Sequence, residues 1–260
     1  MPLPLSRSAL DRLGKRLAAE TVSTADWGTF ETVLDAYQAT LDDAQGILEA
    51  AGFEPTTRVK STGTLVEKLS RGTSFKSVQD VAGARVVVNG GRVDQDRAVA
   101  RIAKAFTAVG TTVKILDRRA SPNHGYRAVH LILIHQGLPL EVQVRTPLQD
   151  LWAQITERLG DLWGRELRYG EPLVPPNQPV VLGMTAPVFT RENFVDMLLA
   201  TSEEIDRVEQ MQMRRYQEQD EIVIRVTEQT GVTPPLDETE DTLRRTMEDI
   251  MRLVRKLEGG

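Results

Sequence analysis

Apolar side chains recur along this chain at two spacings, one typical of amphipathic helices and one typical of strands. The helical spacing predicts helices over residues 9–20, 25–51, 62–71, 92–109, 147–164, 190–230 and 236–258. Short alternating or β-branched runs predict strands over residues 57–61, 84–89, 111–116, 128–135 and 138–146. Gln136-Gly137 between the last two strands indicates a hairpin. Strands that alternate with helices predict an α/β or α+β fold with a mixed sheet flanked by helices.

These elements divide the chain into four predicted segments. N-terminal helices occupy residues 1–56 and pack on a core of strands and helices over residues 57–164. Five prolines indicate an irregular connection over residues 165–189, and residues 190–260 form a long C-terminal helical extension.

The last predicted helix carries an apolar stripe, formed by Leu243, Met247, Ile250, Val254 and Leu257. Such a stripe packs either on the same chain or against a helix of a second copy. The spacing alone leaves both alternatives open.

Composition excludes several classes of site. The chain has no cysteine, which excludes disulfides, thiolate zinc sites and a cysteine nucleophile. It contains neither a G-x-x-x-x-G-K-[ST] loop nor a G-x-G-x-x-G motif, which excludes a P-loop enzyme and gives no indication of a dinucleotide fold. The three histidines lie within residues 124–135 and none is adjacent to an aspartate, so we expect no His-Asp phosphohydrolase. The N-terminus is amphipathic and no apolar run reaches about 18 residues, so we expect a cytoplasmic protein without a membrane anchor.

Charge is distributed unevenly along the chain. The net charge is -5, yet residues 57–150 carry 15 Lys and Arg against 7 Asp and Glu. A local basic region within an acidic protein favours a nucleotide ligand over an extended nucleic acid, which would need a broad positive face.

Two segments of the basic region could bind phosphate and metal. Arg58 and Lys60 share one face of a predicted strand, and Lys68 follows on the next helix, so three cations could converge on a triphosphate. Asp80 precedes a buried strand, where a carboxylate is well placed for magnesium. A solvated charged strand and a turn aspartate would give the same patterns.

Two further segments could form a substrate wall. Tyr126 and His130 follow a glycine-led turn at the start of a strand, and the tyrosine ring could stack on a base. Strict alternation puts Glu141, Gln143 and Arg145 on one face of the next strand. A core tyrosine and a solvent-facing strand are the alternatives.

Together the four segments resemble the synthetase domain of RelA/SpoT-type (p)ppGpp synthetases, and most closely the small alarmone synthetases. The matching motifs cover residues 58–60 with 67–68, 79–85, 125–130, 141–146 and 151–153. The resemblance extends over roughly residues 55–160. It implies a nucleotidyltransferase-like fold and a GTP pyrophosphokinase (GTP diphosphokinase) that moves pyrophosphate from ATP to the ribose 3′-hydroxyl of GDP or GTP, as in stringent-response signalling.

The resemblance also assigns roles to residues. Asp80 and Glu141 would be the catalytic pair: Asp80 would bind Mg²⁺, and Glu141 would help to bind it or take the 3′-hydroxyl proton. The ATP side would be formed by Arg58, Lys60, Thr64, Lys68 and Arg85. The acceptor side would be formed by Tyr126, Arg127, His130, Gln143, Arg145 and Asp150. Small members are often homo-oligomers, and the helical extension could serve that contact.

One departure from the family pattern concerns the acceptor. The family usually has a Glu-His pair where this chain has Glu157-Arg158, and a Tyr-Lys after it. The preferred acceptor therefore stays open, and toxic relatives that modify tRNA 3′ ends or adenine nucleotides are a first alternative. A catalytically silent nucleotide-binding module is a second.

Overall fold

The computed structural model describes residues 5–19, 22–164, 166–167, 170–171, 175, 177–180, 189–226 and 238–258. The chain forms two compact units. Unit 1 consists of Met1–Val87, Arg97–Leu116 and Val129–Val144. Unit 2 consists of Val88–Asp96, Asp117–Ala128 and Arg145–Gly260. Each unit combines stretches from several of the four segments that the sequence predicts. The division of the chain into those four segments therefore stays a prediction.

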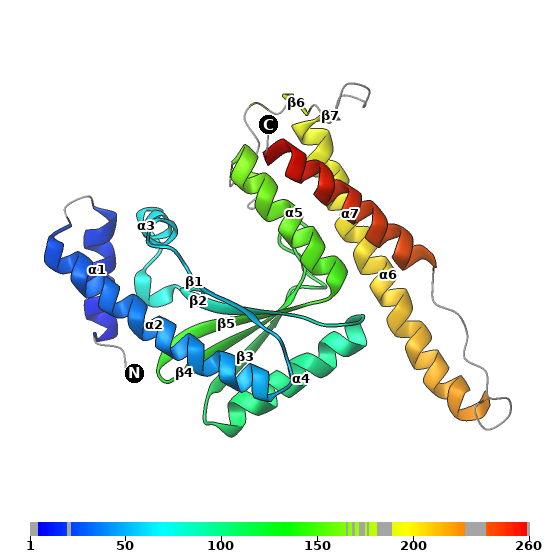
Figure 1. Ribbon diagram of the computed structural model, residues 1–260, viewed down its shortest axis with the longest axis horizontal. Helices are drawn as coiled ribbons and strands as arrows, with labels where there is room; N and C mark the ends of the chain where they lie inside the picture. The colour runs from blue at the N-terminus through cyan, green and yellow to red at the C-terminus, as the bar shows by residue number, and fades with distance from the viewer. Residues whose placement is uncertain are drawn as a thin grey trace. The chain divides into compact units, whose positions relative to one another are not determined.

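Unit 1 is built on a five-stranded sheet (Figure 1). The strands are β1 (Thr56–Val59), β2 (Ala82–Val87), β3 (Thr112–Asp117), β4 (Val129–His135) and β5 (Leu138–Arg145). Their order in the sheet is β1-β2-β5-β4-β3. The pairs β1/β2 and β4/β5 are antiparallel, and β4/β5 is the predicted hairpin, with Gln136 and Gly137 both at positive φ in its turn.

The central pair β2/β5 runs parallel. The Gly83 backbone lies against the Glu141 carbonyl, which would be 2.9 Å from a Cβ at that glycine. Five residues further along, the Val88 N–H donates to the Arg145 carbonyl at 2.9 Å. Both strands therefore advance in the same direction, and the sheet is mixed, as the sequence predicts.

Helices of the N-terminal half pack on this sheet and on one another. α1 (Arg7–Ala18), α2 (Thr24–Ala50) and α3 (Thr62–Ser70) come from the N-terminal half, with a 3-10 turn at Phe75–Ser77. The Ser23 side chain and Asp26 form a capping box at the start of α2, which packs on β1 and β2. α4 (Arg92–Ala108) reaches the same sheet through Phe106, whose ring meets that of His135 edge-on.

The two faces of the sheet differ in burial. Residues that alternate along β2, β4 and β5 are buried, as in Ala84, Leu131 and Val142. Their neighbours on the other face, such as Arg85, His130 and Glu141, are half-buried. This more open face of unit 1 is the one that carries the predicted chemistry.

Unit 2 is mainly helical. It contains α5 (Pro147–Trp163), α6 (Arg191–Val226) and α7 (Glu238–Glu258), with a small pair of strands, β6 (Pro179–Val180) and β7 (Phe189–Thr190). The short strands lie where the sequence predicts only an irregular connection. The helix predicted over residues 190–230 corresponds to α6, which is described as far as Val226. Residues 227–230 of that prediction lie outside the described part of the chain.

The apolar stripe of α7 packs on its own chain. Met247, Ile250 and Val254 are buried in one cluster with residues of α5 and α6. The first of the two alternatives for this stripe is therefore confirmed. No helix in the described part of the chain is long and apolar enough to cross a membrane.

Candidate active site

Asp80 is held by two lysines on unit 1. One carboxylate oxygen accepts a hydrogen bond from Lys60, which follows β1, and the other accepts from the Lys68 Nζ of α3 at 2.9 Å. The Lys60 N–H also donates to the Val81 carbonyl at 2.8 Å, which ties the end of β1 to the loop before β2. Two of the three predicted phosphate-binding cations thus meet at one carboxylate.

These lysines keep Asp80 ionised. Burial raises the pKa of the Asp80 carboxyl, but the hydrogen bonds and charges of Lys60 and Lys68 lower it by more, so the net pKa is below its ordinary value. The stabilisation from this pairing is therefore complete above the ordinary carboxyl pKa and is lost as the pH falls through the lowered one.

Glu141 contacts two polar side chains on the open face of the sheet. The His130 Nδ1 lies 2.8 Å from its Oε1, and the Gln143 Nε2 donates to its Oε2 at 2.8 Å. The β4/β5 register makes this possible, because it places His130 directly opposite Gln143.

Asp80 and Glu141 are near enough to repel each other. Burial raises the pKa of Glu141, the His130 and Gln143 contacts lower it, and the negative charge of Asp80 raises it; the net pKa is below its ordinary value. Two ionised carboxylates that repel each other fit a divalent cation that takes oxygen ligands. Among the described residues no group of three acidic, histidine or cysteine side chains could jointly hold a metal.

The other predicted ATP-side residues also lie on unit 1. The β1/β2 register pairs Arg58 with Gly83 and Thr56 with Arg85, so both arginines stand on the same face of the sheet. Arg58 is exposed and Arg85 half-buried. Thr64 lies in the first turn of α3, with its hydroxyl 2.9 Å from that of the capping Ser61.

Three predicted acceptor residues form one cluster on unit 2. The buried Arg145 donates from Nη1 to Asp150 and from Nη2 to the Tyr126 hydroxyl, both at 3.0 Å. Its Cζ lies 5.1 Å from the centre of the Tyr126 ring. His130 and Gln143 instead lie with Glu141 on unit 1.

Arg127 has a different environment from the predicted one. Its guanidinium is 4% exposed and donates to Ser202 and Glu203 of α6. It also pairs with Asp206 at 3.2 Å. Because these contacts occupy the side chain within the protein, we do not retain Arg127 among the proposed nucleotide ligands.

The partners of Arg127 and of the start of α5 carry no signal in the sequence. Ser202, Asp206 and Glu209 sit on a predicted helix at positions that look like ordinary polar surface. Only the fold shows that Ser202 and Glu209 are buried against segments that precede them by more than fifty residues.

Part of the chain matches a known family. Residues 57–159 match the family model described as "Region found in RelA / SpoT proteins". This match confirms the resemblance that the sequence motifs predict, and it includes both carboxylates of the candidate site.

Curated relatives extend the likeness beyond that region. The chain is 33% identical over 175 residues to uncharacterized proteins of Mycobacterium bovis and Mycobacterium tuberculosis. The aligned part is 65% of this chain and 63% of each relative, so the chain spans less than two thirds of their length.

Solved structures share the fold. Small alarmone synthetase 1 of Bacillus subtilis matches with a TM-score of 0.55 and 21% identity, over 74% of this chain and 98% of that one. Small alarmone synthetase 2 of the same organism matches with a TM-score of 0.54 and 20% identity, over 73% and 98%. At this identity the likeness confirms the predicted fold class.

Proposed function

We propose that this chain, whose residues 57–159 match the region found in RelA / SpoT proteins, transfers pyrophosphate from ATP to the 3′-hydroxyl of GDP or GTP. The observation that carries the proposal is a pair of carboxylates on unit 1, with Asp80 held by Lys60 and Lys68, and Glu141 in contact with His130 and Gln143. A structural relative, small alarmone synthetase 1 of Bacillus subtilis, has been solved bound to its product pppGpp, which supports the choice of a guanine acceptor.

In the proposed reaction the ribose 3′-oxygen attacks the β-phosphorus of ATP. A new oxygen–phosphorus bond forms there, and the bond from the β-phosphorus to the bridging oxygen of the α-phosphate breaks, which releases AMP. Glu141 takes the hydroxyl proton, and its lowered pKa keeps it unprotonated at neutral pH. Such a positioned base typically contributes about 10²–10⁴-fold.

Asp80 and Glu141 would hold Mg²⁺, which would offset the negative charge of the phosphates. Lys60 and Lys68 would turn from Asp80 to the ATP phosphates, while Arg58 and Arg85 would flank the adenine. For binding of the acceptor we propose Tyr126, Arg145 and Asp150 on unit 2, and His130 and Gln143 on unit 1. The remaining catalysis would come from alignment of the two nucleotides.

The decisive measurement is separation of reaction products after incubation with magnesium, ATP and one acceptor at a time. We expect AMP together with a 3′-pyrophosphorylated nucleotide when GDP or GTP is offered. Asp80→Asn and Glu141→Gln should each lower turnover by at least about 10²-fold, because each removes one of the two charges at the reacting centre. Full turnover in either variant, with unchanged unfolding curves, would refute the proposed mechanism.

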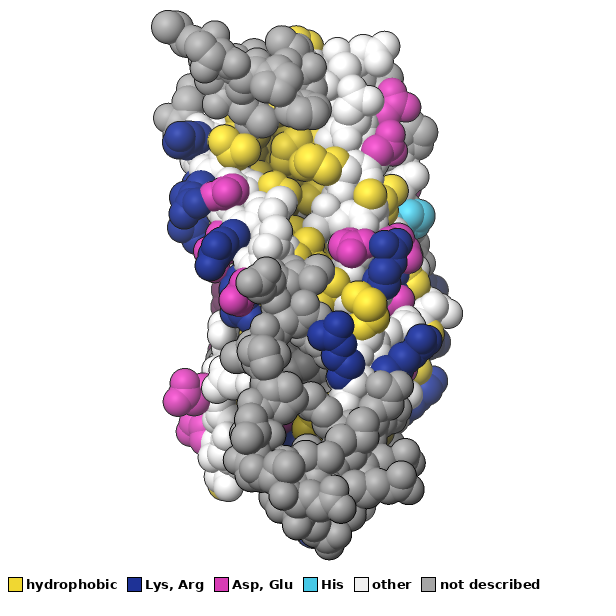
Figure 2. All heavy atoms as spheres, turned by 90° about the vertical axis from the view of Figure 1, so that its right-hand side faces the viewer, with side chains coloured by type: hydrophobic (Ala, Val, Ile, Leu, Met, Phe, Trp, Pro, Cys, Tyr) yellow, Lys and Arg dark blue, Asp and Glu magenta, His cyan; other side chains and the backbone are white. Residues whose placement is uncertain are grey.

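The same assay decides among acceptors when GMP, ATP and tRNA are also offered. On the face drawn in Figure 2, basic and acidic side chains intermingle, and the described atoms form no continuous basic surface there. That face therefore offers tRNA no extended positive path, and the acidic net charge of -5 likewise favours a free nucleotide. Labelled tRNA as the main product would reverse this preference.

A silent nucleotide-binding module is the competing class. It would bind ATP in titration calorimetry and release no AMP with any acceptor. The presence of both carboxylates, each ionised by its surroundings, favours the enzyme. Self-association through the helical extension remains part of the proposal and is measured directly by light scattering.

A further inference from the structure

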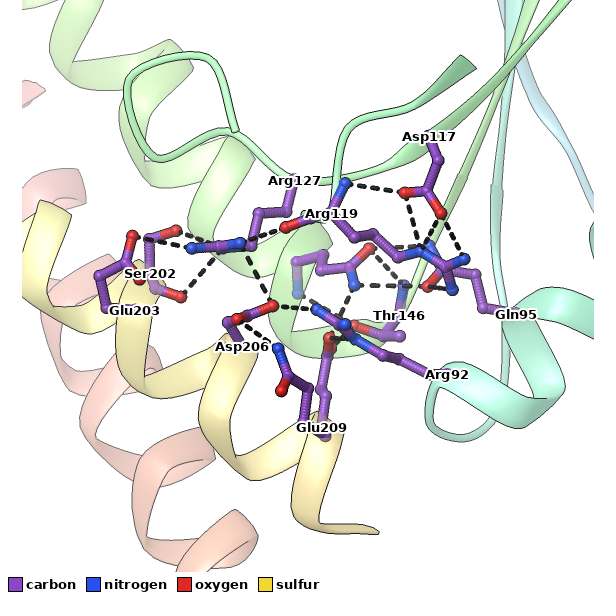
Figure 3. Close-up of polar contacts among 12 residues, drawn as sticks. Arg92, Gln95, Asp117, Arg119, Arg127, Thr146, Ser202, Glu203, Asp206 and Glu209 are labelled. Atoms are coloured by element: carbon purple, nitrogen blue, oxygen red, sulfur yellow. Dashed lines mark hydrogen bonds and ion pairs between the residues drawn. The ribbon is translucent and has the colours of Figure 1, made fainter. Parts of the chain in front are cut away.

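One face of α6 carries three polar residues at helical spacing: Ser202, Asp206 and Glu209. Residues four and three positions apart on a helix line up on one side. Figure 3 shows this row directed at the polypeptide segments around Arg127, Arg92 and Thr146. All of these residues belong to unit 2.

Glu209 fastens the start of α5. Thr146 is the N-cap of that helix and forms a capping box with Gln149. One carboxylate oxygen of Glu209 accepts from the Thr146 hydroxyl, and the other accepts from the Gln149 Nε2 at 2.8 Å. A single side chain of α6 therefore holds both members of the capping box.

This contact is deeply buried. Glu209 is 2% exposed and Arg92 is 8% exposed, and the Arg92 Nε donates to Glu209 at 3.1 Å. Arg92 also pairs with Asp206. Buried charges that are paired and fully hydrogen-bonded hold a fixed geometry, because each lost partner leaves a charge uncompensated.

The other end of the row fastens the segment around Tyr126. The Ser202 hydroxyl donates to the Gly125 carbonyl at 2.5 Å. Asp206 and the Ser202 backbone carbonyl contact the Arg127 guanidinium. Tyr126 is thereby bracketed on both sides by residues that α6 holds in place.

The row thus reaches both segments that carry the proposed acceptor cluster. Arg145 directly precedes Thr146, and Asp150 directly follows Gln149. The Arg145 guanidinium donates to both Asp150 and the Tyr126 hydroxyl, which joins the two segments in one cluster. α6 also lies beyond the family region, which ends at residue 159.

We infer that Glu209, supported by Arg92, is a positioning residue that sets the acceptor cluster through the capping box of α5. This inference rests on the proposed function and adds to it a determinant of acceptor binding on a helix outside the family region. Because the row holds the two segments that carry the acceptor cluster, we expect its loss to weaken acceptor binding more than ATP binding.

The test is a comparison of KM values for GDP and for ATP in Glu209→Ala, measured by product separation. We expect the KM for GDP to rise on the order of tenfold, a size typical of coupling within one hydrogen-bond network. The KM for ATP should change by less than about twofold. Thr146→Val removes the hydroxyl but keeps the shape of the side chain, and it should likewise raise the KM for GDP and leave the KM for ATP unchanged. Thr146→Ser keeps the hydroxyl and should have the wild-type KM for GDP.

Glu204→Ala is the matched control, since Glu204 lies on the same helix and pairs only with Arg207 among the contacts described. It should leave both KM values unchanged. Equal changes in both KM values, or a wild-type GDP value in Thr146→Val, would overturn the inference whether or not Glu209→Ala folds. Absence of transfer by the wild-type protein would instead defeat the proposed function itself.

Discussion

At the scale of single residues, Glu141 is balanced between groups with opposite effects on its pKa. Burial and the charge of Asp80 raise that pKa, while His130 and Gln143 lower it. The His130 ring is the strongest of the lowering contacts. The protonation of the proposed base therefore depends on a histidine that need not itself exchange protons with substrate.

Replacement of His130 should move the pH dependence of turnover. In His130→Ala the burial of Glu141 stays and the main lowering contact is lost, so the pKa of Glu141 rises. Because turnover needs the ionised carboxylate, the acidic limb of the kcat profile should shift to higher pH. His130→Asn keeps a hydrogen-bond donor and should shift it less. An acidic limb at the same pH in all three proteins would contradict this account.

Sequence alternation predicts part of this residue chemistry. It places Glu141 and Gln143 on one face, and the structure brings them into contact. It also groups Arg145 with them, whereas the structure turns that guanidinium to Tyr126 and Asp150. The partners of Arg127 on α6 lie about 75 residues further along the chain, a separation at which no local pattern could indicate them.

At the scale of elements, the parallel contact between β2 and β5 has no room for a side chain at Gly83. A Cβ there would stand 2.9 Å from the Glu141 carbonyl oxygen, which belongs to backbone and cannot swing away. This close approach places the strand after Asp80 directly beside the strand that carries Glu141.

Gly83→Ala should therefore destabilise the protein by about 1–3 kcal/mol, as expected for overpacking against backbone. Urea unfolding followed by circular dichroism measures the loss. Gly46→Ala is the control, because nothing lies within 4 Å of a Cβ at that position in α2. It should stabilise the helix by about 0.5–1 kcal/mol. If Gly83→Ala and Gly46→Ala had the same free energy of unfolding, β2 and β5 could move apart to admit the methyl group without loss of stability.

The elements themselves follow closely from the sequence. The predicted hairpin and the helices before residue 164 appear with shifts of at most two or three residues at their ends. β6 and β7 do not, because a strand of two residues contains no repeat of the hydrophobic pattern. The parallel pairing of β2 with β5 could not be predicted from the sequence either, because the residues of a strand do not specify which strand lies next to it.

At the scale of the whole molecule, each of the two units has hydrophobic residues of its own to bury. In unit 2 the core joins α5, α6 and α7, and Met247 of α7 is completely buried in it. The stability of the helices in unit 2 should therefore depend on the last helix of the chain.

Met247→Ala should cost about 2–5 kcal/mol, because it removes a buried side chain and leaves a cavity. Hydrogen exchange should show faster exchange in α5 and α7 and unchanged protection in α2, which belongs to unit 1. Met211→Ala, at a residue 37% exposed on α6, should stay within about 0.5 kcal/mol of wild type. Loss of protection spread evenly over α2 as well would contradict separate cores.

The polar row on α6 has a consequence for how acceptor preference is inherited among related proteins. Tyr126, Arg145 and Asp150 lie inside the family region, whereas Glu209 lies fifty residues beyond its end. A chimaera that received the family region alone would thus inherit the side chains of the acceptor cluster without the helix that orients them. Relatives could diverge in acceptor preference with every motif of the nucleotide site unchanged.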